Sequence, residues 1–346
     1  MAPTTTLDIP PFRPAPGLAN PHVQTIAGKL LRPKLELPLW RERLETPDGD
    51  FLDLDFAFDP AAGSTGEPGA FPEDPTSPVA VLLHGLEGSA RRRYMKHTYR
   101  ALLAHGLRPV GLNFRGCSGE PNRTARAYHS GETSDLRLVL DHLAGRWPDA
   151  PRAVLGYSLG GNVALKLLGE EGRTGDGRVA AGAAVSVPFD LAAGAEALER
   201  SWLGRTIYTR YFMRTLVPKT LARADLLGDR IDLDAVRGAR TIRGFDDALT
   251  APLHGFDGAA DYYARSSSRR FLADIDVPTL VVHSCDDPFL PASAIPETEL
   301  TANPAITPLI TGTGGHQGYV GGSILQPDFW VERVVAGWLG DVLRKG

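Results

Sequence analysis

The stretch LGYSLGGN, at residues 155–162, holds the residue pattern with the clearest capacity for chemistry. Gly156, Ser158 and Gly160 match the pattern G-x-S-x-G, and they lie between an apolar run and the helix-forming segment NVALKLLGE. A serine on such a strand-to-helix turn is held in a strained conformation with its hydroxyl exposed, and small neighbours allow the strand and the helix to approach closely. The pattern therefore predicts that Ser158 is a nucleophile.

A serine hydroxyl becomes a good nucleophile only when a base removes its proton, and a carboxylate must orient that base. In proteins with this type of turn, the acid and then the histidine follow the serine along the chain, on loops after later strands. His316 lies between glycines in TGTGGHQGYV, and it is the one histidine of nine that comes after the candidate acids. We therefore predict that His316 is the base.

The candidate acids are Asp286 and Asp287, which end the apolar run in VVHSCDDPFLP. The general D-x-x-x-P pattern of such loops, counted back from Pro291, selects Asp287 as the acid that orients the base. Asp286 is one residue too early for this pattern. Two roles stay open for Asp286: a helix or turn cap, or a polar neighbour that helps to orient the loop.

Hydrolysis also requires hydrogen-bond donors for the negative oxygen of a tetrahedral intermediate. The backbone N–H of Leu159, directly after the serine, is one predicted donor of this oxyanion hole, and the backbone N–H of Leu86 in HGLEG is the other. His84 lies in the same loop. We predict that it braces the loop, because the last loop of the chain already supplies a base.

Other polar residues have simpler interpretations. The sequence alone does not show that any basic group lies close to the Cys117 thiol in NFRGCSG, so a reactive thiol is not favoured. Asp246 and Asp247 precede no apolar strand, which favours a cap or salt-bridge role. No group of His, Cys, Asp or Glu has metal-ligand spacing, and the glycine-rich segments lack both the P-loop lysine and the dinucleotide fingerprint. We therefore expect no metal and no cofactor.

The order of the remaining elements predicts an α/β fold. Short runs of consecutive apolar residues alternate with helical segments, a pattern typical of parallel strands that are covered on both faces. The runs span residues 79–85, 108–116, 153–158, 180–188, 278–284 and, more weakly, 306–311. Before them, PDGD joins RERLET to FLDLDFAF in a predicted β-hairpin. The predicted architecture is a mostly parallel, doubly wound sheet.

The same pattern divides the chain into four parts. Residues 1–40 are rich in proline and are expected to form an extended arm packed on the core, and residues 41–187 the first part of that core. Residues 188–272 interrupt the rhythm, and the i, i+4 spacing in SWLGRTIYTRYFMRTLV predicts a helical cap insertion. Residues 273–346 complete the core with an amphipathic last helix. Residues 59–78 consist of turn-forming and small residues, which predicts a mobile surface loop.

Composition limits the partners of the chain. The 346 residues carry a formal net charge of −4 with acids and bases mixed throughout, so no basic stripe along the sequence indicates a nucleic acid or an anionic membrane surface. Two cysteines cannot build a disulfide framework. Neither a secretory signal nor an apolar run of membrane-spanning length, ~18 residues, is present. We therefore expect a cytoplasmic protein that acts on a small molecule, and composition says nothing of its oligomeric state.

Nine motifs spread over nearly the whole chain form a combination more specific than the serine turn alone. They are NPHVQTI (20–26), LLHGLEGSA (82–90), NFRGCSGEPN (113–122), YHSGET (128–133), GYSLGGN (156–162), FDDALTAPLHGF (245–256), YYARSS (262–267), DDPFLP (286–291) and GGHQGY (314–319). In this combination the chain resembles the YheT-like group of the α/β-hydrolase superfamily, which includes bacterial esterases and eukaryotic relatives that process acylglycerols, phospholipids and medium-chain esters.

The resemblance implies an α/β-hydrolase fold and an ester hydrolase, with Ser158, Asp287 and His316 in the triad positions and Leu86 and Leu159 at the oxyanion hole. The H-x-x-x-x-D acyltransferase motif of some eukaryotic relatives is absent, which favours hydrolysis over acyl transfer. The motif NPHVQTI has no chemical role that the residues alone explain. We interpret its His22 and Gln24 as ties between the arm and the core rather than as parts of an acyl pocket.

The predicted function is that of a serine carboxylic ester hydrolase that acts through an acyl-enzyme on short- to medium-chain esters. The cap aromatics Trp202, Tyr208, Tyr211 and Phe212 suggest a substrate with an apolar acyl group, although packing of the cap onto the core explains them more readily. Two other possibilities stay open. The same triad could transfer the acyl group to an alcohol or to peroxide, or the chain could be a non-catalytic ligand-binding protein with this fold.

Overall fold

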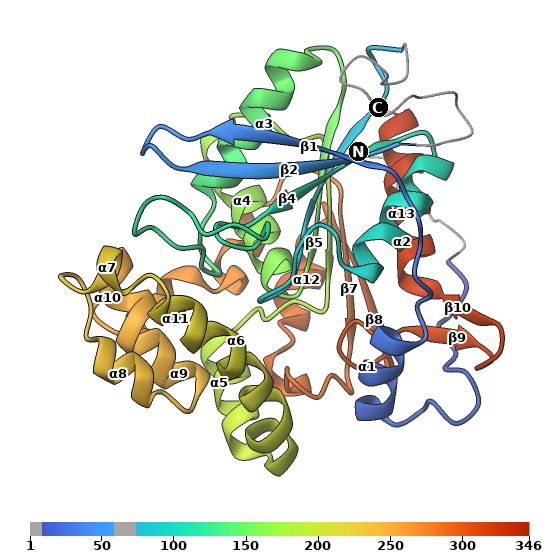
Figure 1. Cartoon of the computed structure of the whole chain (residues 1–346). Coiled ribbons are helices and arrows are strands. Elements are labelled where there is room, and N and C mark those ends of the chain that lie inside the picture. Colours follow the sequence, from blue (N-terminus) through green and yellow to red (C-terminus); the bar gives the residue numbers. More distant parts are fainter. Residues whose placement is uncertain (1–8, 59–73, 346) are drawn as a thin grey trace.

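An eight-stranded sheet forms the centre of the molecule (Figure 1). The computed structural model describes residues 9–58 and 74–345, so most of the loop predicted at 59–78 lies outside the described residues. The strand order is β1-β2-β4-β3-β5-β6-β7-β8. The strands are β1 (Leu39–Glu45), β2 (Phe51–Ala57), β3 (Val79–Leu83), β4 (Arg108–Asn113), β5 (Arg152–Tyr157), β6 (Ala181–Val185), β7 (Thr279–Ser284) and β8 (Ile306–Thr311).

Strands β3 to β8 pair in parallel, and β1 and β2 extend the sheet as an antiparallel hairpin beside β4. Every residue of β3, β6 and β7 is buried, because helices cover both faces of the sheet. This burial explains why apolar residues follow one another in the sequence without alternation. The predicted mostly parallel, doubly wound sheet is confirmed.

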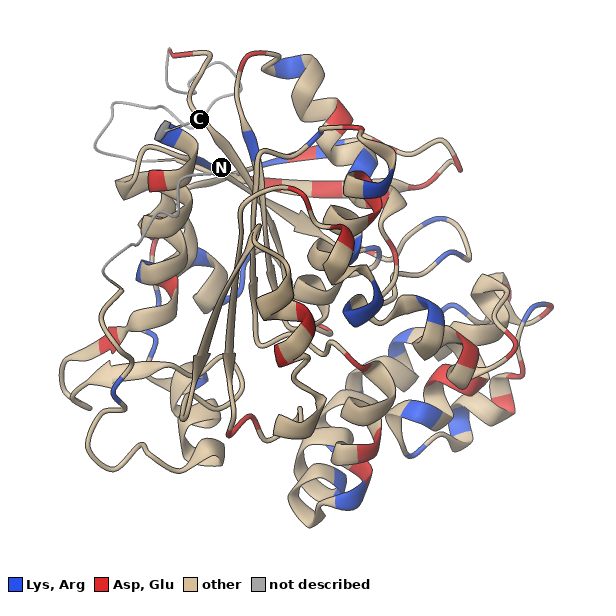
Figure 2. Cartoon of the chain, turned by 180° about the vertical axis from the view of Figure 1, so that it is seen from behind, with Lys and Arg blue, Asp and Glu red and all other residues tan. Residues whose placement is uncertain are grey.

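Each face of the sheet has its own helical layer and its own apolar core. On one face lie α2 (Arg93–Ala104) and α13 (Trp330–Lys345), and on the other lie α3 (Ser134–Arg146) and α4 (Leu159–Thr174) (Figure 1). Seen from behind, the inner strands carry few charged residues, which gather instead on the helices and loops (Figure 2). Among the helices of residues 9–58 and 74–345, none combines the length and the hydropathy needed to cross a lipid bilayer.

The chain between β6 and β7 forms a layer of short helices, the predicted cap (Figure 1). The helices are α5 (Leu191–Arg200), α6 (Arg210–Leu221), α7 (Ala224–Leu227), α8 (Leu233–Gly238), α9 (Ile242–Phe245), α10 (Ala251–His254) and α11 (Ala259–Ser266). A π-helical turn, Gly204–Thr209, leads into α6. The cap has two apolar clusters of its own, one around Leu216 and Phe245 and one around Tyr262 and Tyr263. A short helix, α12 (Glu297–Ala302), precedes β8.

The segment before the sheet differs from the extended arm predicted for residues 1–40, because it contains the helix α1 (Pro21–Leu30). The Asn20 side chain begins this helix by accepting hydrogen bonds from the N–H groups of His22 and Val23. Pro21 occupies the first turn, where its missing N–H is not needed. Helix α1 contacts β9 (Val320–Gly322), which pairs with β10 (Pro327–Phe329) in a second, two-stranded sheet. Residues 1–8 lie outside the described residues.

Candidate active site

Ser158 lies on the turn between β5 and α4, where its backbone adopts φ 53° and ψ −120°. A positive φ is uncommon for a residue with a side chain and costs on the order of 1 to 3 kcal/mol. The start of α4 approaches the end of β3 so closely that a Cβ on Gly160 would lie 2.6 Å from the carbonyl oxygen of Leu83. The turn therefore needs glycine at this position, as the pattern G-x-S-x-G predicts.

Two hydrogen bonds connect Ser158, His316 and Asp287. His316 Nε2 lies 3.0 Å from Ser158 Oγ, and His316 Nδ1 lies 2.8 Å from Asp287 Oδ2. The side chain of Asp287 has no exposed surface, so water does not screen its charge, and its other oxygen accepts a hydrogen bond from the N–H of Phe289. A carboxylate in this position favours the imidazole tautomer with its proton on Nδ1. The structure thus brings these three sequence-predicted residues together.

Asp286 lies beside this group, but it binds the backbone of the histidine loop instead of the imidazole. Its Oδ1 accepts a hydrogen bond of 2.9 Å from the N–H of Gly315. The Ser284 hydroxyl donates to the carbonyl oxygen of the same glycine. Of the two roles left open by the sequence, this geometry corresponds to the neighbour that orients the loop.

The loop after β3 is braced on both sides of Leu86. The N–H of Gly85 donates to the Tyr94 hydroxyl, and the N–H of Glu87 donates to the Tyr128 hydroxyl. The Tyr128 hydroxyl donates in turn to the Glu87 carboxylate. Within the described residues, the backbone N–H groups of Leu86 and of Leu159, the first residue of α4, have no hydrogen-bond acceptor. Both leucines line the cavity that contains Ser158, so these two donors are free for a ligand there.

His84 supports the same loop with both of its ring nitrogens. Nδ1 lies 2.8 Å from the carbonyl oxygen of Gly85, and Nε2 accepts a hydrogen bond from the N–H of Phe114. An imidazole that donates from one nitrogen and accepts at the other is neutral, and complete burial lowers the pKa of His84 to about 4. This geometry fits the bracing role predicted for His84.

The unfolding free energy is expected to fall as the pH is lowered from about 6.5 to about 4. The pKa of His84 is depressed from 6.5 to about 4 in the folded state, so the stabilisation is present above pH 6.5 and is lost as the pH falls towards 4. Burial lowers the pKa values of His129, His254 and His283 in the same direction. For His84 alone the effect is at most about 3 kcal/mol.

Urea unfolding of the wild type at pH 7 and pH 4.5 measures this fall. It should be smaller in His84→Asn, because asparagine does not titrate. The control is His105→Asn, which removes a partly exposed histidine. An equal fall in both variants would contradict a contribution of His84 to the pH dependence.

Helix α1 holds the histidine loop from the outside. The N–H of His316 donates to Thr25 Oγ1 at 2.9 Å. The side-chain amide of Gln24 accepts from the N–H of Val320 and donates to its carbonyl oxygen. Gln24 therefore ties the arm to the core, as interpreted from the sequence. The role of Thr25 is not predicted by the sequence. The one hint of this contact in the sequence is that the motifs NPHVQTI, which contains Thr25, and GGHQGY, which contains His316, both occur in this chain.

Replacing Thr25 with valine keeps the shape of the side chain and removes the acceptor of the His316 N–H. We expect kcat for a nitrophenyl ester to fall by about 5- to 100-fold, because one hydrogen bond contributes ~1 kcal/mol and misplacement of a reacting group costs up to ~10²-fold. Thr25→Ser keeps the hydroxyl and should restore kcat. KM should stay close to the wild-type value in both variants. A loss that serine does not rescue, together with an equal loss of thermal stability, would contradict a positioning role.

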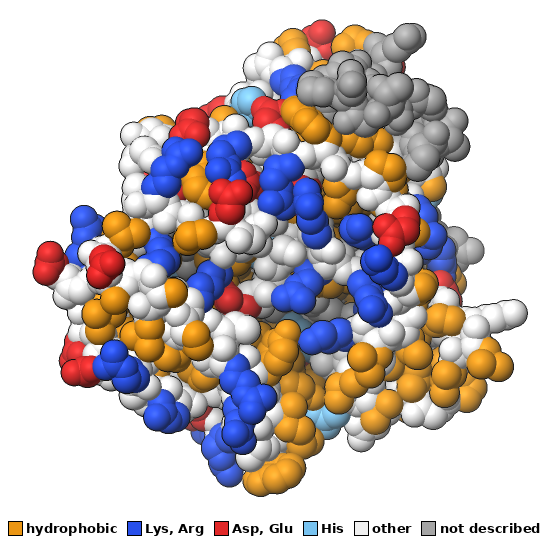
Figure 3. Space-filling model, in the orientation of Figure 1, with side chains coloured by type: hydrophobic (Ala, Val, Ile, Leu, Met, Phe, Trp, Pro, Cys, Tyr) orange, Lys and Arg blue, Asp and Glu red, His pale blue; other side chains and the backbone are white. Residues whose placement is uncertain are grey.

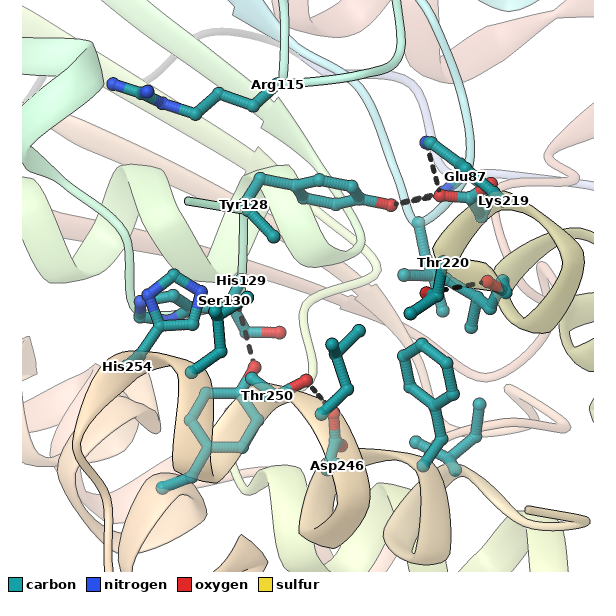
Figure 4. A pocket seen from close by; sticks show the side chains of 18 of the residues that line it. Glu87, Arg115, Tyr128, His129, Ser130, Lys219, Thr220, Asp246, Thr250 and His254 are labelled. Atoms are coloured by element: carbon teal, nitrogen blue, oxygen red, sulfur yellow. Dashed lines mark hydrogen bonds and ion pairs between the residues drawn. The ribbon is translucent and has the colours of Figure 1, made fainter. Parts of the chain in front are cut away.

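Two cavities meet at Leu86 and Leu159, which line both. The first has a volume of about 110 Å³ and contains Ser158 and His316. Its apolar wall is formed by Leu191, Gly194, Ala195, Leu198, Phe212, Phe289 and Leu290. The second has a volume of about 120 Å³ and lies under the cap, with apolar walls and several polar residues. Figure 4 shows Glu87, Lys219 and Tyr128 at one end of it, and Asp246, Thr250 and His254 at the other.

The aromatic residues of the cap do not share one position. Phe212 lines the cavity beside Ser158, and the Tyr208 ring packs edge-on against Phe289 with centroids 4.5 Å apart. Trp202 and Tyr211 instead lie on the outer surface, with 67% and 44% of their area exposed. Of the four aromatics that suggest an apolar acyl group, Phe212 is therefore the one that lines this cavity.

Asp246, Asp247 and Cys117 have structural partners. Asp247 accepts a hydrogen bond from the N–H of Ala259 at the start of α11, which is a cap role. Asp246 forms no ion pair within the described residues; it accepts hydrogen bonds from the hydroxyl groups of Thr250 and Tyr263, and burial raises its pKa to about 6. Lys219 Nζ lies 3.3 Å from the Cys117 sulfur, but burial outweighs this charge and raises the pKa of the thiol to about 11. In the described part of the chain, no group of three or more His, Cys, Asp or Glu residues could hold a metal ion.

Backbone strain is concentrated around Ser158. Five non-glycine residues of the described chain have a positive φ: Glu87 (52°), Ser158 (53°), Ser186 (52°), Gln317 (57°) and Tyr319 (46°). Glu87 belongs to the loop after β3, and Gln317 and Tyr319 belong to the histidine loop. The Ser186 hydroxyl accepts a hydrogen bond from the N–H of Gln317, so it also supports that loop. Strained residues of this kind cluster at functional sites.

This chain is similar to several known proteins. The model of the family described as "Serine aminopeptidase, S33" matches residues 74–303. The chain is 38% identical over 335 residues to "Putative esterase YheT" of Escherichia coli (strain K12), covering 96% of this chain and 94% of that protein. It is 30% identical over 325 residues to "Phospholipase ABHD3" of Mus musculus, covering 93% of this chain and 76% of that protein. The structure of the Pyrococcus furiosus esterase Pf2001 shares the fold, with a TM-score of 0.54 at 14% identity over 89% of this chain and 93% of that one.

Proposed function

We propose that this chain, which belongs to the YheT-like group of α/β-hydrolases, is a serine carboxylesterase that hydrolyses short- to medium-chain esters through an acyl-enzyme. Several relatives are named as an esterase, a phospholipase or a lipase, and the chain belongs to this esterase- and lipase-type family of hydrolases. The observation that carries the finer proposal is the chain of hydrogen bonds from Asp287 through His316 to Ser158, beside an apolar cavity.

In the proposed reaction, Ser158 Oγ attacks the ester carbonyl carbon while His316 Nε2 accepts the hydroxyl proton. The bond to the alcohol oxygen then breaks, and His316 returns the proton to that oxygen, which leaves an acyl group on Ser158. Water attacks this acyl-enzyme, again with His316 as base, and the acid departs as Ser158 regains its proton. Asp287 holds the imidazole orientation and stabilises the imidazolium formed in each half of the reaction.

The oxyanion of each tetrahedral intermediate is proposed to accept hydrogen bonds from the N–H groups of Leu86 and Leu159. Both N–H groups lack an acceptor within the described residues and border the cavity of Ser158. Removal of one such donor typically costs ~10²- to 10³-fold in rate. The bracing of the loop by Tyr94 and Tyr128 supports this role, because a donor stabilises charge best when it need not reorganise during the reaction.

Substitution of the three proposed catalytic residues tests the reaction. Ser158→Ala should lower kcat for nitrophenyl butyrate by at least ~10³-fold and abolish labelling by a fluorophosphonate probe. Asp287→Asn should lower kcat by ~10²- to 10⁴-fold, because an amide stabilises the wrong imidazole tautomer. The matched control is Asp286→Asn, which keeps an oxygen acceptor for the N–H of Gly315 and should lose less than ~10-fold. A larger loss at Asp286 than at Asp287 would reverse the assignment of the acid.

The acyl acceptor is tested by product analysis with added alcohol or peroxide. We expect the free carboxylic acid as the main product, because the proposal has water attack the acyl-enzyme. A new ester or a peracid as the main product would replace hydrolysis with acyl transfer or perhydrolysis at the same triad.

The cavity beside Ser158 favours a short acyl group. Its volume of about 110 Å³ is smaller than the ~150 Å³ of an engineered protein cavity that holds benzene. The wall is mostly apolar, although Ser130 and Asp246 also line it, and each methylene of the acyl chain buried against its apolar part contributes about 0.8 kcal/mol. Phe212 and Gly194 lie on that wall and set its limits from α6 and α5.

Changes at Gly194 and Phe212 should shift the preferred acyl length in opposite directions. Gly194→Val adds bulk, starting 3.3 Å from the Leu290 side chain, and should move the optimum of kcat/KM to shorter esters. Phe212→Ala removes a ring and should move it to longer esters. A series of nitrophenyl esters of increasing acyl length measures the optimum, with the acetate ester as an internal control that changes less than ~threefold. If the dependence of kcat/KM on acyl length stayed the same in both variants, the acyl group would have to occupy the second cavity instead.

A further inference from the structure

An exposed apolar surface lies beside the candidate active site, where α1 meets the segment 202–214. The Tyr208 hydroxyl lies 2.8 Å from His22 Nδ1, and Lys29 Nζ donates to the Tyr211 hydroxyl and lies 4.5 Å from the centre of its ring. Nine large apolar side chains are exposed in the described residues, and six of them lie on these two segments. They are Val23, Ile26, Leu30, Trp202, Ile207 and Tyr211. We call these six residues, with the basic residues among them, the α1–α6 surface.

The charged residues on the helices of this surface are all basic. Four of them, Lys29, Arg205, Arg210 and Arg214, are exposed and form no ion pair within residues 9–58 and 74–345, whereas Lys219, farther along α6, pairs with Glu87. Residues 17–35 and 201–224 contain no Asp or Glu, although the whole chain has a net charge of −4. Figure 3 shows hydrophobic and basic side chains together over α1 and α6. The sequence shows no basic stripe because the fold builds this surface from two distant segments.

The α1–α6 surface forms the outer side of the wall that closes the cavity of Ser158. Tyr211 faces outwards, while its neighbour Phe212 lines the cavity. Phe289 connects the two sides: its ring contacts Tyr208 and stacks on the His316 ring, with centroids 4.3 Å apart. A ligand that covers this surface therefore lies one side chain away from the candidate catalytic residues.

We propose that the α1–α6 surface docks the protein on an anionic lipid bilayer. Exposed apolar side chains of a helix enter the boundary between headgroups and acyl chains, and Lys and Arg around them are attracted to anionic lipids. A second copy of this chain fits less well, because a two-fold contact would place the same four positive charges against one another. Docking is a property of the surface alone, whereas its use for taking ester substrates from the bilayer rests on the proposed function.

The test is binding of the full chain to vesicles, with Ser158→Ala used so that turnover plays no part. We expect the protein to sediment with vesicles of phosphatidylcholine and phosphatidylglycerol, to bind phosphatidylcholine alone more weakly, and to be released by high salt. Among the five tryptophans, Trp202 is the exposed one. Binding should therefore shift tryptophan fluorescence to the blue, and Trp202→Phe should remove the shift while the protein still sediments.

Charge variants locate the contact. Arg210→Gln with Arg214→Gln should weaken binding to anionic vesicles by about fivefold for each charge removed. The control is Arg100→Gln, an exposed arginine of α2 without an ion pair in the described residues, which should bind like the parent. Leu226→Ser removes an exposed apolar side chain on α7 and should also have no effect.

With Ser158 restored, the double arginine variant should hydrolyse a soluble nitrophenyl ester at the wild-type rate, since neither arginine lines the cavity. This measurement separates a failure of docking from a failure of the proposed function. Absence of binding to anionic vesicles, or equal weakening by the control variants, would overturn the proposal. A stable dimer in solution that loses stability on Ile207→Ser would also overturn it, because it would assign the surface to a second copy.

Discussion

The imidazole of His316 must meet a hydroxyl on one side and a carboxylate on the other, and most of the architecture serves this requirement. Its two partners are separated from it along the chain by 158 and 29 residues. The loop that carries it has glycine on both sides and so has little rigidity of its own. External contacts supply that rigidity: Asp286 and Ser284 from the end of β7, Ser186 from the end of β6, and Thr25 from α1.

A buried ion pair also fixes the loop. Arg32, just after α1, donates to the carbonyl oxygens of Gln317 and Gly318 and pairs with Glu332 of α13. Both side chains of this pair are almost fully buried, so the guanidinium depends on these acceptors for its hydrogen bonds. The loop thus contacts two elements from opposite ends of the described chain, and the close fit leaves no room for side chains at Gly314, Gly315 and Gly318. A Cβ on Gly315 would lie 2.6 Å from the carbonyl oxygen of Pro21.

The sequence predicts those parts of this arrangement that depend on local rules. The serine turn follows from steric demands on neighbouring residues, and the carboxylate spacing selects Asp287 by counting to Pro291. Contacts between distant segments follow no such rule. The i, i+4 spacing around Tyr211 predicts a helix correctly, yet it cannot tell which face is covered, because the partner, α1, lies more than 180 residues earlier and reads as an extended arm. For the same reason Thr25 has no visible role until α1 and the histidine loop are seen side by side.

The backbone strain at Ser158 and at the four other residues with a positive φ affects the thermal stability of the active site. At on the order of 1 to 3 kcal/mol each, their combined strain is comparable with the 5 to 15 kcal/mol that keeps a typical domain folded. Local unfolding around Ser158 therefore releases strain free energy. We expect heating to abolish enzyme activity at a lower temperature than it unfolds the central sheet. Glycine at Ser158 or Gln317 would adopt the same backbone conformation with less strain, whereas Tyr319 is fully buried against Phe12 and Trp330, so its removal would cost more in packing than the strain it relieves. The backbone strain around Ser158 is thus a cost in stability that accompanies the exposure of the proposed nucleophile.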